Sequence, residues 1–96
     1  MRYPWKDMYG IEIEIGDYVK DAKNGRMGYV EFDWRKVPCI HMVEEYSPKY
    51  GWITLDNKCP IEAYQRPLFN EHKSKFYWYR HHYVLSHIVV LKKRYK

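Results

Sequence analysis

Two short strand-like runs joined by a turn occupy residues 15–32, which read IGDYVKDAKNGRMGYVEF. Asn24-Gly25 is the strongest hairpin signal in the chain, because these residue types accept the positive φ angles of a tight turn. Beyond the turn, residues 29–34 alternate between two faces, as expected of a strand with one buried side. Gly28 stands where a side chain would crowd a bulge or a crossing strand. This stretch therefore predicts a β-hairpin.

The same rhythm extends to both sides of the predicted hairpin. Residues 11–15 alternate isoleucine with glutamate, which is typical of a half-buried strand. Residues 38–46 and 52–55 are two further strand candidates, each followed by turn residues. The apolar run over residues 88–91 predicts a buried final strand. Short strands with polar turns indicate an all-β domain, a small barrel or sandwich.

Residues 58–82 interrupt this rhythm. Pro60 and Pro67 exclude a long helix, so residues 61–65 can form only a short one. Four consecutive aromatic residues follow at positions 76–79, flanked by lysine, arginine and histidine. Because aromatic residues favour extended structure, we expect an irregular, basic and aromatic insertion in extended or hairpin-like form.

Two parts of the chain resemble a known family. Residues 15–20 and 24–30 resemble the opening of SH3-like barrels, especially KOW-type modules, which begin with a Gly-Asp pair before a strand valine. In those modules a Gly-rich turn and a glycine-x-valine sequence follow, as they do here. Residues 85–91 look like the one-turn helix and the last strand of the same barrel.

This resemblance implies a small five-stranded SH3-like barrel, strongly bent, as a single domain over residues 1–96. Its core strands would lie at about residues 11–56 and 83–93, with the insertion at 58–82 before the last strand. Domains of this kind bind nucleic acid, ribosomal RNA, RNA polymerase or peptides and are rarely enzymes. The expected core residues are Ile11, Ile13, Ile15, Val19, Val30, Phe32, Ile53, Leu55, Ile88 and Val90.

The net charge of +5 is unevenly distributed along the chain. Residues 1–56 contain eight Lys and Arg against ten Asp and Glu, whereas residues 57–96 contain nine against two. Such an asymmetry between halves indicates an acidic partner, either nucleic acid or an acidic protein surface.

Positive charge and flat rings interleave within residues 64–83. Single-stranded nucleic acid is held in this way, with cations on its phosphates and bases stacked on rings. The alternative is that the rings cover the barrel while the cations stay solvated. Alternate side chains of an extended run share a side, so we assign Phe76 and Trp78 to the interior. The predicted contact residues are Arg66, Lys73, Lys75, Tyr77, Tyr79, Arg80, His82, Lys92, Lys93 and Arg94.

The cysteines and histidines do not form a recognisable metal motif. Cys39 and His41 share a strand face and Cys59 could approach them, which makes these three the candidate metal ligands. Structural zinc sites usually present paired ligands at Cys-x₂₋₄-Cys or His-x₃₋₅-His spacing, and no such cysteine pair exists. We therefore predict no metal, no other cofactor and two reduced thiols, although one bridge between the two cysteines stays open.

No constellation of nucleophile, base and orienting group appears in the sequence, so we predict that the protein is not an enzyme. The function that we expect is a non-catalytic binding module for nucleic acid, RNA or DNA, or for a nucleoprotein complex. The alternative is a protein–protein interaction module, such as a phage-type accessory protein or inhibitor that binds a host enzyme, because Tyr, Trp and Arg dominate binding hot spots. No apolar stretch approaches the roughly 20 residues of a membrane span, so we expect a cytoplasmic protein without a membrane or small-molecule partner.

Overall fold

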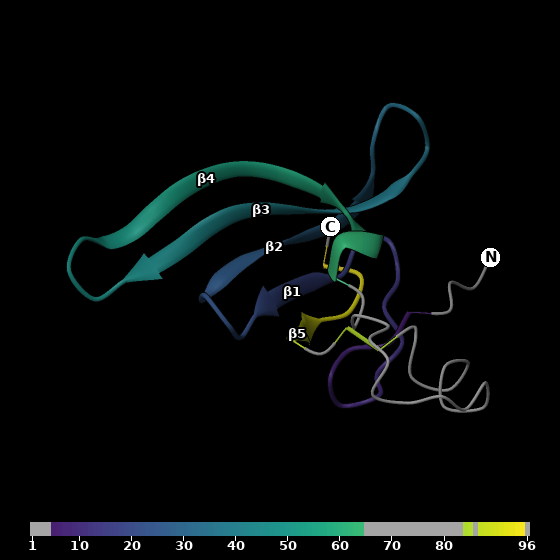
Figure 1. Ribbon diagram of the computed structural model, residues 1–96, viewed down its shortest axis with the longest axis horizontal. Helices are drawn as coiled ribbons and strands as arrows, with labels where there is room; N and C mark the ends of the chain where they lie inside the picture. The colour runs from purple at the N-terminus through teal and green to yellow at the C-terminus, as the bar shows by residue number, and fades with distance from the viewer. Residues whose placement is uncertain (1–4, 65–83, 86, 96) are drawn as a thin grey trace, which may run out of the picture.

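The computed structural model describes residues 5–64, 84–85 and 87–95. Five antiparallel strands form one sheet in the order β4-β3-β2-β1-β5 (Figure 1). The prediction of a five-stranded, all-β protein is confirmed. In the described part of the chain, no helix is long and apolar enough to cross a membrane. The elements are β1 (Tyr18–Asp21), β2 (Arg26–Phe32), β3 (Pro38–Ser47), β4 (Gly51–Pro60), the 3-10 helix η1 (Ile61–Tyr64) and β5 (Ile88–Lys92).

The sheet is open, with β4 and β5 as its two edges. Among the described residues no strand pairing joins these edges, so the closed SH3-like barrel implied by the resemblance is not confirmed. The β3–β4 hairpin extends past β2, whose first residue Arg26 pairs with Glu45 while β3 continues to Ser47. Figure 1 shows this hairpin curving away from the shorter strands. A register shift between Met42 and Glu44 accompanies the curve, as β-bulges increase local bend and twist.

The β1–β2 hairpin forms at the turn that the sequence indicates. Gly25 has a φ angle of 76°, and the Asn24 side chain accepts a hydrogen bond from the Arg26 N–H at 3.0 Å. At Gly28 the backbone of β3 approaches so closely that an added Cβ would lie 2.0 Å from the His41 carbonyl oxygen. The predicted turn and the predicted crowding at this glycine are both confirmed.

Residues 11–15 do not form the strand that their alternation predicts. Glu12 makes only an isolated bridge, with Lys6, and Ile11 is 46% exposed. Asp7 is fully buried, and its Oδ1 accepts hydrogen bonds from two N–H groups, including that of Ile11 at 2.8 Å, which close a turn over residues 7–11. After this turn the segment lies beside residues 5–6, where the Ile13 N–H donates to the Trp5 carbonyl at 3.0 Å, and Ile13 is the isoleucine of the pattern that is fully buried.

The core lies on one face of the sheet. Of the expected core residues, four are buried in it and three are partly buried against it, whereas Ile11 and Phe32 are exposed. Phe32 ends β2, where the chain leaves the sheet, and Trp34 beyond it is 88% exposed. Ile53 is half-buried outside the core cluster. The cluster comprises Trp5, Ile13, Val19, Val30, Ile40, Met42, Ile61, Leu85 and Ile88, with Ile15, Leu55, Tyr64 and Val90 packed against it.

The start of the predicted insertion is wrong. Residues 58–60 belong to β4, which continues five residues beyond the expected strand 52–55. Residues 61–65, for which the sequence allowed at most a short helix, contain the 3-10 helix η1, which buries Ile61 in the core. Residues 65–83, the main part of the predicted insertion, lie outside the described residues.

Candidate binding face

The strands present a polar and aromatic face opposite the core. Tyr18 pairs with Tyr29 on β2 and with Lys92 on β5, Tyr29 pairs with His41 on β3, and His41 pairs with Lys58 on β4. Directly paired residues share a face, so these five form one row across the whole sheet. Because side chains alternate along each strand, the row lies opposite the buried valines of β1 and β2. We call this side the outer face.

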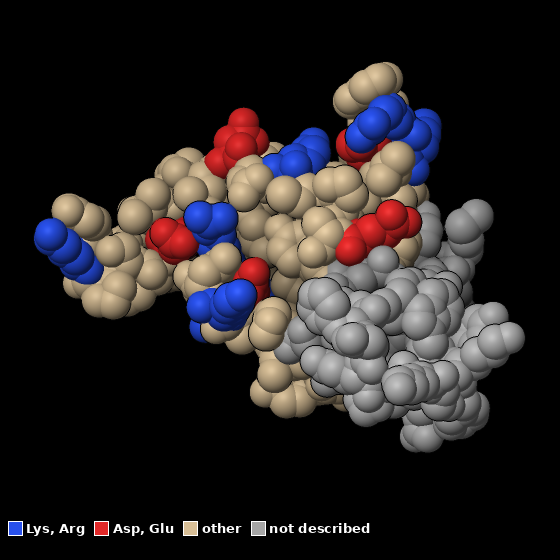
Figure 2. All heavy atoms as spheres, in the orientation of Figure 1, with Lys and Arg blue, Asp and Glu red and all other residues tan. Residues whose placement is uncertain are grey.

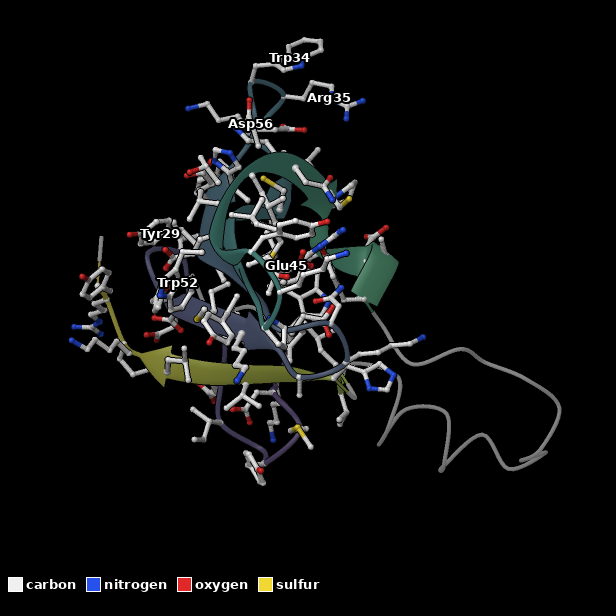
Figure 3. The ribbon with its side chains drawn as sticks, turned by 90° about the vertical axis from the view of Figure 1, so that its left-hand side faces the viewer. Tyr29, Trp34, Arg35, Glu45, Trp52 and Asp56 are labelled. Carbon is white, nitrogen blue, oxygen red and sulfur yellow. The ribbon has the colours of Figure 1, made fainter. Side chains whose placement is uncertain are left out.

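Figure 3 shows the two sides of the curved sheet. Tyr29 and Trp52 point away from one side, and Glu45 lies on the other, beneath the curve of β4. Glu45 pairs there with Arg26, whose Nε lies 3.1 Å from its carboxylate oxygen. The outer face is therefore distinct from the side that carries the core and the Arg26–Glu45 ion pair.

Three tyrosine rings meet on the outer face. We call Tyr18, Tyr29 and Tyr95 the tyrosine cluster. The centroid of the Tyr18 ring is 5.2 Å from that of Tyr29 and 5.3 Å from that of Tyr95. The Tyr29 and Tyr95 rings stack with centroids 5.9 Å apart and an interplanar angle of 12°. The Lys92 Nζ lies 5.0 Å from the centroid of the Tyr95 ring, in the geometry of a cation–π contact.

The ring of Tyr18 is fixed from its far end. Its hydroxyl donates a hydrogen bond to the Glu44 carboxylate. Burial, followed by this bond to Glu44, raises the pKa of Tyr18 well above its usual range. The phenol is therefore neutral throughout the physiological range, and the carboxylate has a donor on the outer face.

The C-terminal tail is held beside the cluster by Asp17, which is fully buried. One of its oxygens, Oδ2, accepts hydrogen bonds from the Lys93 Nζ at 2.5 Å and from the Glu14 N–H at 2.8 Å. The other oxygen, Oδ1, accepts the Arg94 N–H at 2.9 Å. These bonds fix the two residues before Tyr95, so the third ring of the cluster is placed by a carboxylate 78 positions earlier in the chain.

The three predicted tail cations follow one another at the end of β5, and Lys92 lies beside the tyrosine cluster. Lys93 is engaged in the fold through Asp17, and its Nζ also lies 3.3 Å from a Glu14 oxygen. The Arg94 side chain is 81% exposed, and its Nε lies 3.6 Å from the same Glu14 oxygen. Lys92 is exposed and lies against Tyr95. Lys92 and Arg94 are thus the accessible pair, while Lys93 acts as a tether.

The opposite end of the row is a closed network of charges. His41 lies between two carboxylates, with Nδ1 2.9 Å from Glu31 and Nε2 2.6 Å from Asp56. Lys58 lies 3.1 Å from the same Glu31 carboxylate, and this hydrogen bond raises the pKa of Lys58. Each carboxylate here has a basic side chain within hydrogen-bond distance.

Cys39, His41 and Cys59 do not come together as metal ligands. Cys59 pairs with Ile40 rather than with Cys39, so alternation puts the two sulfurs on opposite faces of the sheet. Both cysteines are free, which removes the bridge that the sequence left open. Burial raises the pKa of the Cys39 thiol, whose Sγ donates to the Glu31 carbonyl at 3.2 Å. In the described ranges, no group of three or more His, Cys, Asp or Glu residues could hold a metal ion.

A second aromatic group lies at the far end of the β3–β4 hairpin. Tyr46 and Trp52 meet edge to face, with ring centroids 5.4 Å apart, and are 54% and 62% exposed. Tyr50, in the turn, is 72% exposed, and the Lys49 Nζ lies 5.2 Å from its ring centroid. We call Tyr46, Tyr50 and Trp52 the hairpin-end aromatics.

Charges of both signs are interspersed over the described surface, as Figure 2 shows for one side of the molecule. The described residues contain eleven Lys and Arg and eleven Asp and Glu. The whole excess of +5 therefore belongs to residues 1–4, 65–83 and 96. The described sheet is a charge-balanced scaffold rather than a polycation.

Most of the predicted contact residues cannot be placed on this scaffold. Arg66, Lys73, Lys75, Tyr77, Tyr79, Arg80 and His82 lie outside the described residues. The tyrosine cluster was not predicted from the sequence. A signal for two of its members was present, because Tyr18 and Tyr29 occupy the polar face of the predicted hairpin, opposite Val19 and Val30.

Comparisons of the chain with protein-family models, with curated proteins and with solved structures found no match.

Proposed function

We propose that this protein is a non-catalytic binding module for nucleic acid, RNA or DNA, or for a nucleoprotein complex, and that it acts in the cytoplasm. The observation that carries the proposal is the partition of charge. The described residues are balanced, and many of their cations are already paired, among them Arg26, Arg35, Lys58 and Lys93. Three of the five excess positive charges lie in residues 65–83, a run of chain that is also rich in aromatic residues. Cations combined with flat rings suit phosphates and bases.

The accessible tail residues support the same proposal from the described side. Lys92 and Arg94 are exposed; the Lys92 Nζ lies over the Tyr95 ring, and Arg94 directly precedes Tyr95 in the chain. The proposed contact surface joins these two cations to Arg66, Lys73, Lys75, Tyr77, Tyr79, Arg80 and His82, with Lys93 holding the tail in place.

Fluorescence anisotropy with labelled oligonucleotides tests the proposal. The full chain is titrated into single-stranded RNA, single-stranded DNA and duplex DNA at about 50 mM and about 200 mM salt, since phosphate contacts weaken steeply with salt. We expect binding that persists at the higher salt and prefers one ligand. Weak binding that is equal for all three ligands and vanishes at 200 mM salt would contradict the proposal, because any basic protein behaves in that way.

The hairpin-end aromatics favour a second candidate function, recognition of a protein. Exposed tyrosine and tryptophan are enriched at protein interfaces, and Tyr46, Tyr50 and Trp52 gather at the end of one projecting hairpin. In this case the partner is an acidic protein surface, and the chain acts as an adaptor or an inhibitor. A variant with both Trp52→Ala and Tyr46→Ala tests this function. If the variant still binds nucleic acid, the hairpin end serves protein recognition instead. Loss of that binding would assign it to nucleic acid.

A further inference from the structure

We propose that the tyrosine cluster on the outer face is a stacking platform for the bases of single-stranded nucleic acid. This inference rests on the proposed function and deepens it, because it names the site on the described sheet and the strandedness of the ligand. It uses Tyr18, Tyr29 and Tyr95 together with Lys92 and Arg94, and it is independent of residues 65–83.

The position of the rings is the first argument. A tyrosine that serves the fold normally points its ring into the core, whereas Tyr18 and Tyr29 project from the face opposite it. The described strands contact one another along the sheet, and η1 contacts β3 and β4 next to the core. Tyr95 is 53% exposed, so its ring is accessible from solvent, and the Lys92 Nζ lies over it.

The second argument is the combination of ring and cation. Base–aromatic stacking tolerates any sequence, since every base has a flat π surface, and a neighbouring cation neutralises the phosphate of the stacked nucleotide. Lys92 lies 5.0 Å from the Tyr95 centroid, and the exposed Arg94 side chain belongs to the same tail. A base that stacks on Tyr95 takes the place of this ammonium, and the flexible lysine side chain then turns to the phosphate of the same nucleotide.

The third argument is that the platform is ordered before a ligand arrives. Asp17 fixes Lys93 and Arg94, which places Tyr95, and Glu44 fixes the hydroxyl end of Tyr18. Groups that are already held lose less conformational entropy on binding, so a preorganised ring gives more affinity than a free one. Asp17 is fully buried, so its hydrogen bonds to the tail are part of the folded structure and hold the tail more firmly than an exposed surface contact would.

The platform selects single strands for a geometric reason. In a duplex the bases stack on each other and expose only their edges in the grooves, whereas an unpaired base presents its face. The stacked Tyr29 and Tyr95 rings, nearly parallel at 12°, offer a surface of the kind that bases stack on. Bases of a flexible single strand can continue this stack, and those of a rigid duplex cannot.

Substitutions of Tyr95 in the full chain test the inference. Tyr95→Leu keeps an apolar contact with the neighbouring rings but removes the π surface, and Tyr95→Phe keeps the π surface and removes only the hydroxyl. Trp34→Ala is the matched control, because Trp34 is also exposed and has the Arg35 Cζ 5.4 Å from its ring, but it lies in the turn between β2 and β3. The probes are a ten-nucleotide oligo(U), a ten-nucleotide oligo(dT) and a duplex DNA, at about 100 mM salt.

We expect Tyr95→Leu to weaken binding to the preferred single strand by roughly 5-fold or more, the lower end of what loss of one base–ring stack costs. Tyr95→Phe and Trp34→Ala should bind within about twofold of the wild type, and duplex binding should be unchanged by Tyr95→Leu. Circular dichroism establishes that each variant is folded.

Two results would overturn the inference. If Tyr95→Leu binds single strands as the wild type does, or loses single strands and duplex equally, the cluster is not a stacking platform, while the proposed function stands. If the wild type binds none of the three probes, the proposed function fails and the inference fails with it. The two failures are therefore distinguishable in one set of titrations.

Discussion

Substitution of Gly28 by alanine tests how closely β2 and β3 are packed. A Cβ at this position would lie 2.0 Å from the His41 carbonyl oxygen and 2.6 Å from the Met42 Cα, both of which are backbone atoms. Ordinary contact between such atoms begins at about 3.4 Å, so the strands would have to separate by more than 1 Å. A shift of that size exceeds the tolerance of the ladder hydrogen bonds at the register shift beside Gly28.

The expected cost follows from two contributions. Overpacking of a close contact costs about 1–3 kcal/mol, and each hydrogen bond lost from the ladder costs about 1 kcal/mol. We therefore expect Gly28→Ala to lower the free energy of unfolding by about 3–5 kcal/mol, a large part of the 5–15 kcal/mol typical of a domain. Val30 and Ile40, which pair next to this site and are buried, would lose part of their packing as well.

Urea unfolding monitored by tryptophan fluorescence measures this cost. Gly10→Ala is the control, because Gly10 has a φ angle of 85° but no heavy atom within 4 Å of an added Cβ. Its expected cost is the conformational term alone, about 1–2 kcal/mol. If Gly28→Ala lowers the free energy of unfolding by no more than Gly10→Ala does, β2 and β3 do not approach each other as closely at Gly28 as the structure shows.

Three further predictions concern buried groups. In the native protein we expect a thiol reagent such as DTNB to modify Cys59 readily and Cys39 only after unfolding, because Cys39 is buried and burial raises its pKa; equal rates for the two would contradict the structure. We expect Asp7→Ala to lower the free energy of unfolding in urea by about 3 kcal/mol or more, because three backbone N–H groups lose their acceptor. Amide hydrogen exchange at Val90 should become faster, and unchanged exchange there would refute the hydrogen bond between Asp7 and Val90. Burial, followed by the influence of Cys59, raises the pKa of Tyr64 to about 12, so the neutral phenol stabilises the fold below pH 10 and that contribution disappears as pH rises from 10 to 12. The urea midpoint of the wild type should thus fall between pH 9 and pH 11 by more than that of Tyr64→Phe, and equal decreases would count against a buried phenol.

Local turn chemistry made part of the fold predictable. Asn24-Gly25 defines the β1–β2 hairpin because the residues that form the turn are adjacent in sequence. The strand character of β3 and β5 was likewise visible in their β-branched and apolar residues. Such signals depend only on near neighbours, and these predictions are confirmed.

Long-range contacts account for what the sequence did not predict. Residues 11–15 have the alternation of a strand, but Asp7 closes a turn directly before them and also accepts the N–H of Val90, 83 positions after Asp7, and the segment forms an isolated bridge with Lys6 in place of a strand. The second half of β4 contains Asp56 and Lys58, which rarely indicate a strand, and it is extended because it pairs with β3. In both cases a tertiary contact overrides the local preference.

The candidate site illustrates the same limit. The parity of Tyr18 and Tyr29 along the predicted hairpin was available from the sequence. The third ring was not, because Tyr95 reaches the other two through the bonds of Asp17 to the tail. The basic character of the tail was predicted, but its position beside the tyrosine rings depends on that buried carboxylate.

The most direct test of the account is the affinity of the wild-type chain for a single-stranded oligonucleotide at about 200 mM salt, measured by anisotropy against a duplex of the same length. The account predicts saturable binding to the single strand, tighter than the roughly 1–100 µM typical of non-specific binding at physiological salt, and clearly weaker binding to the duplex. Absence of binding to the single strand at this salt concentration would contradict the account.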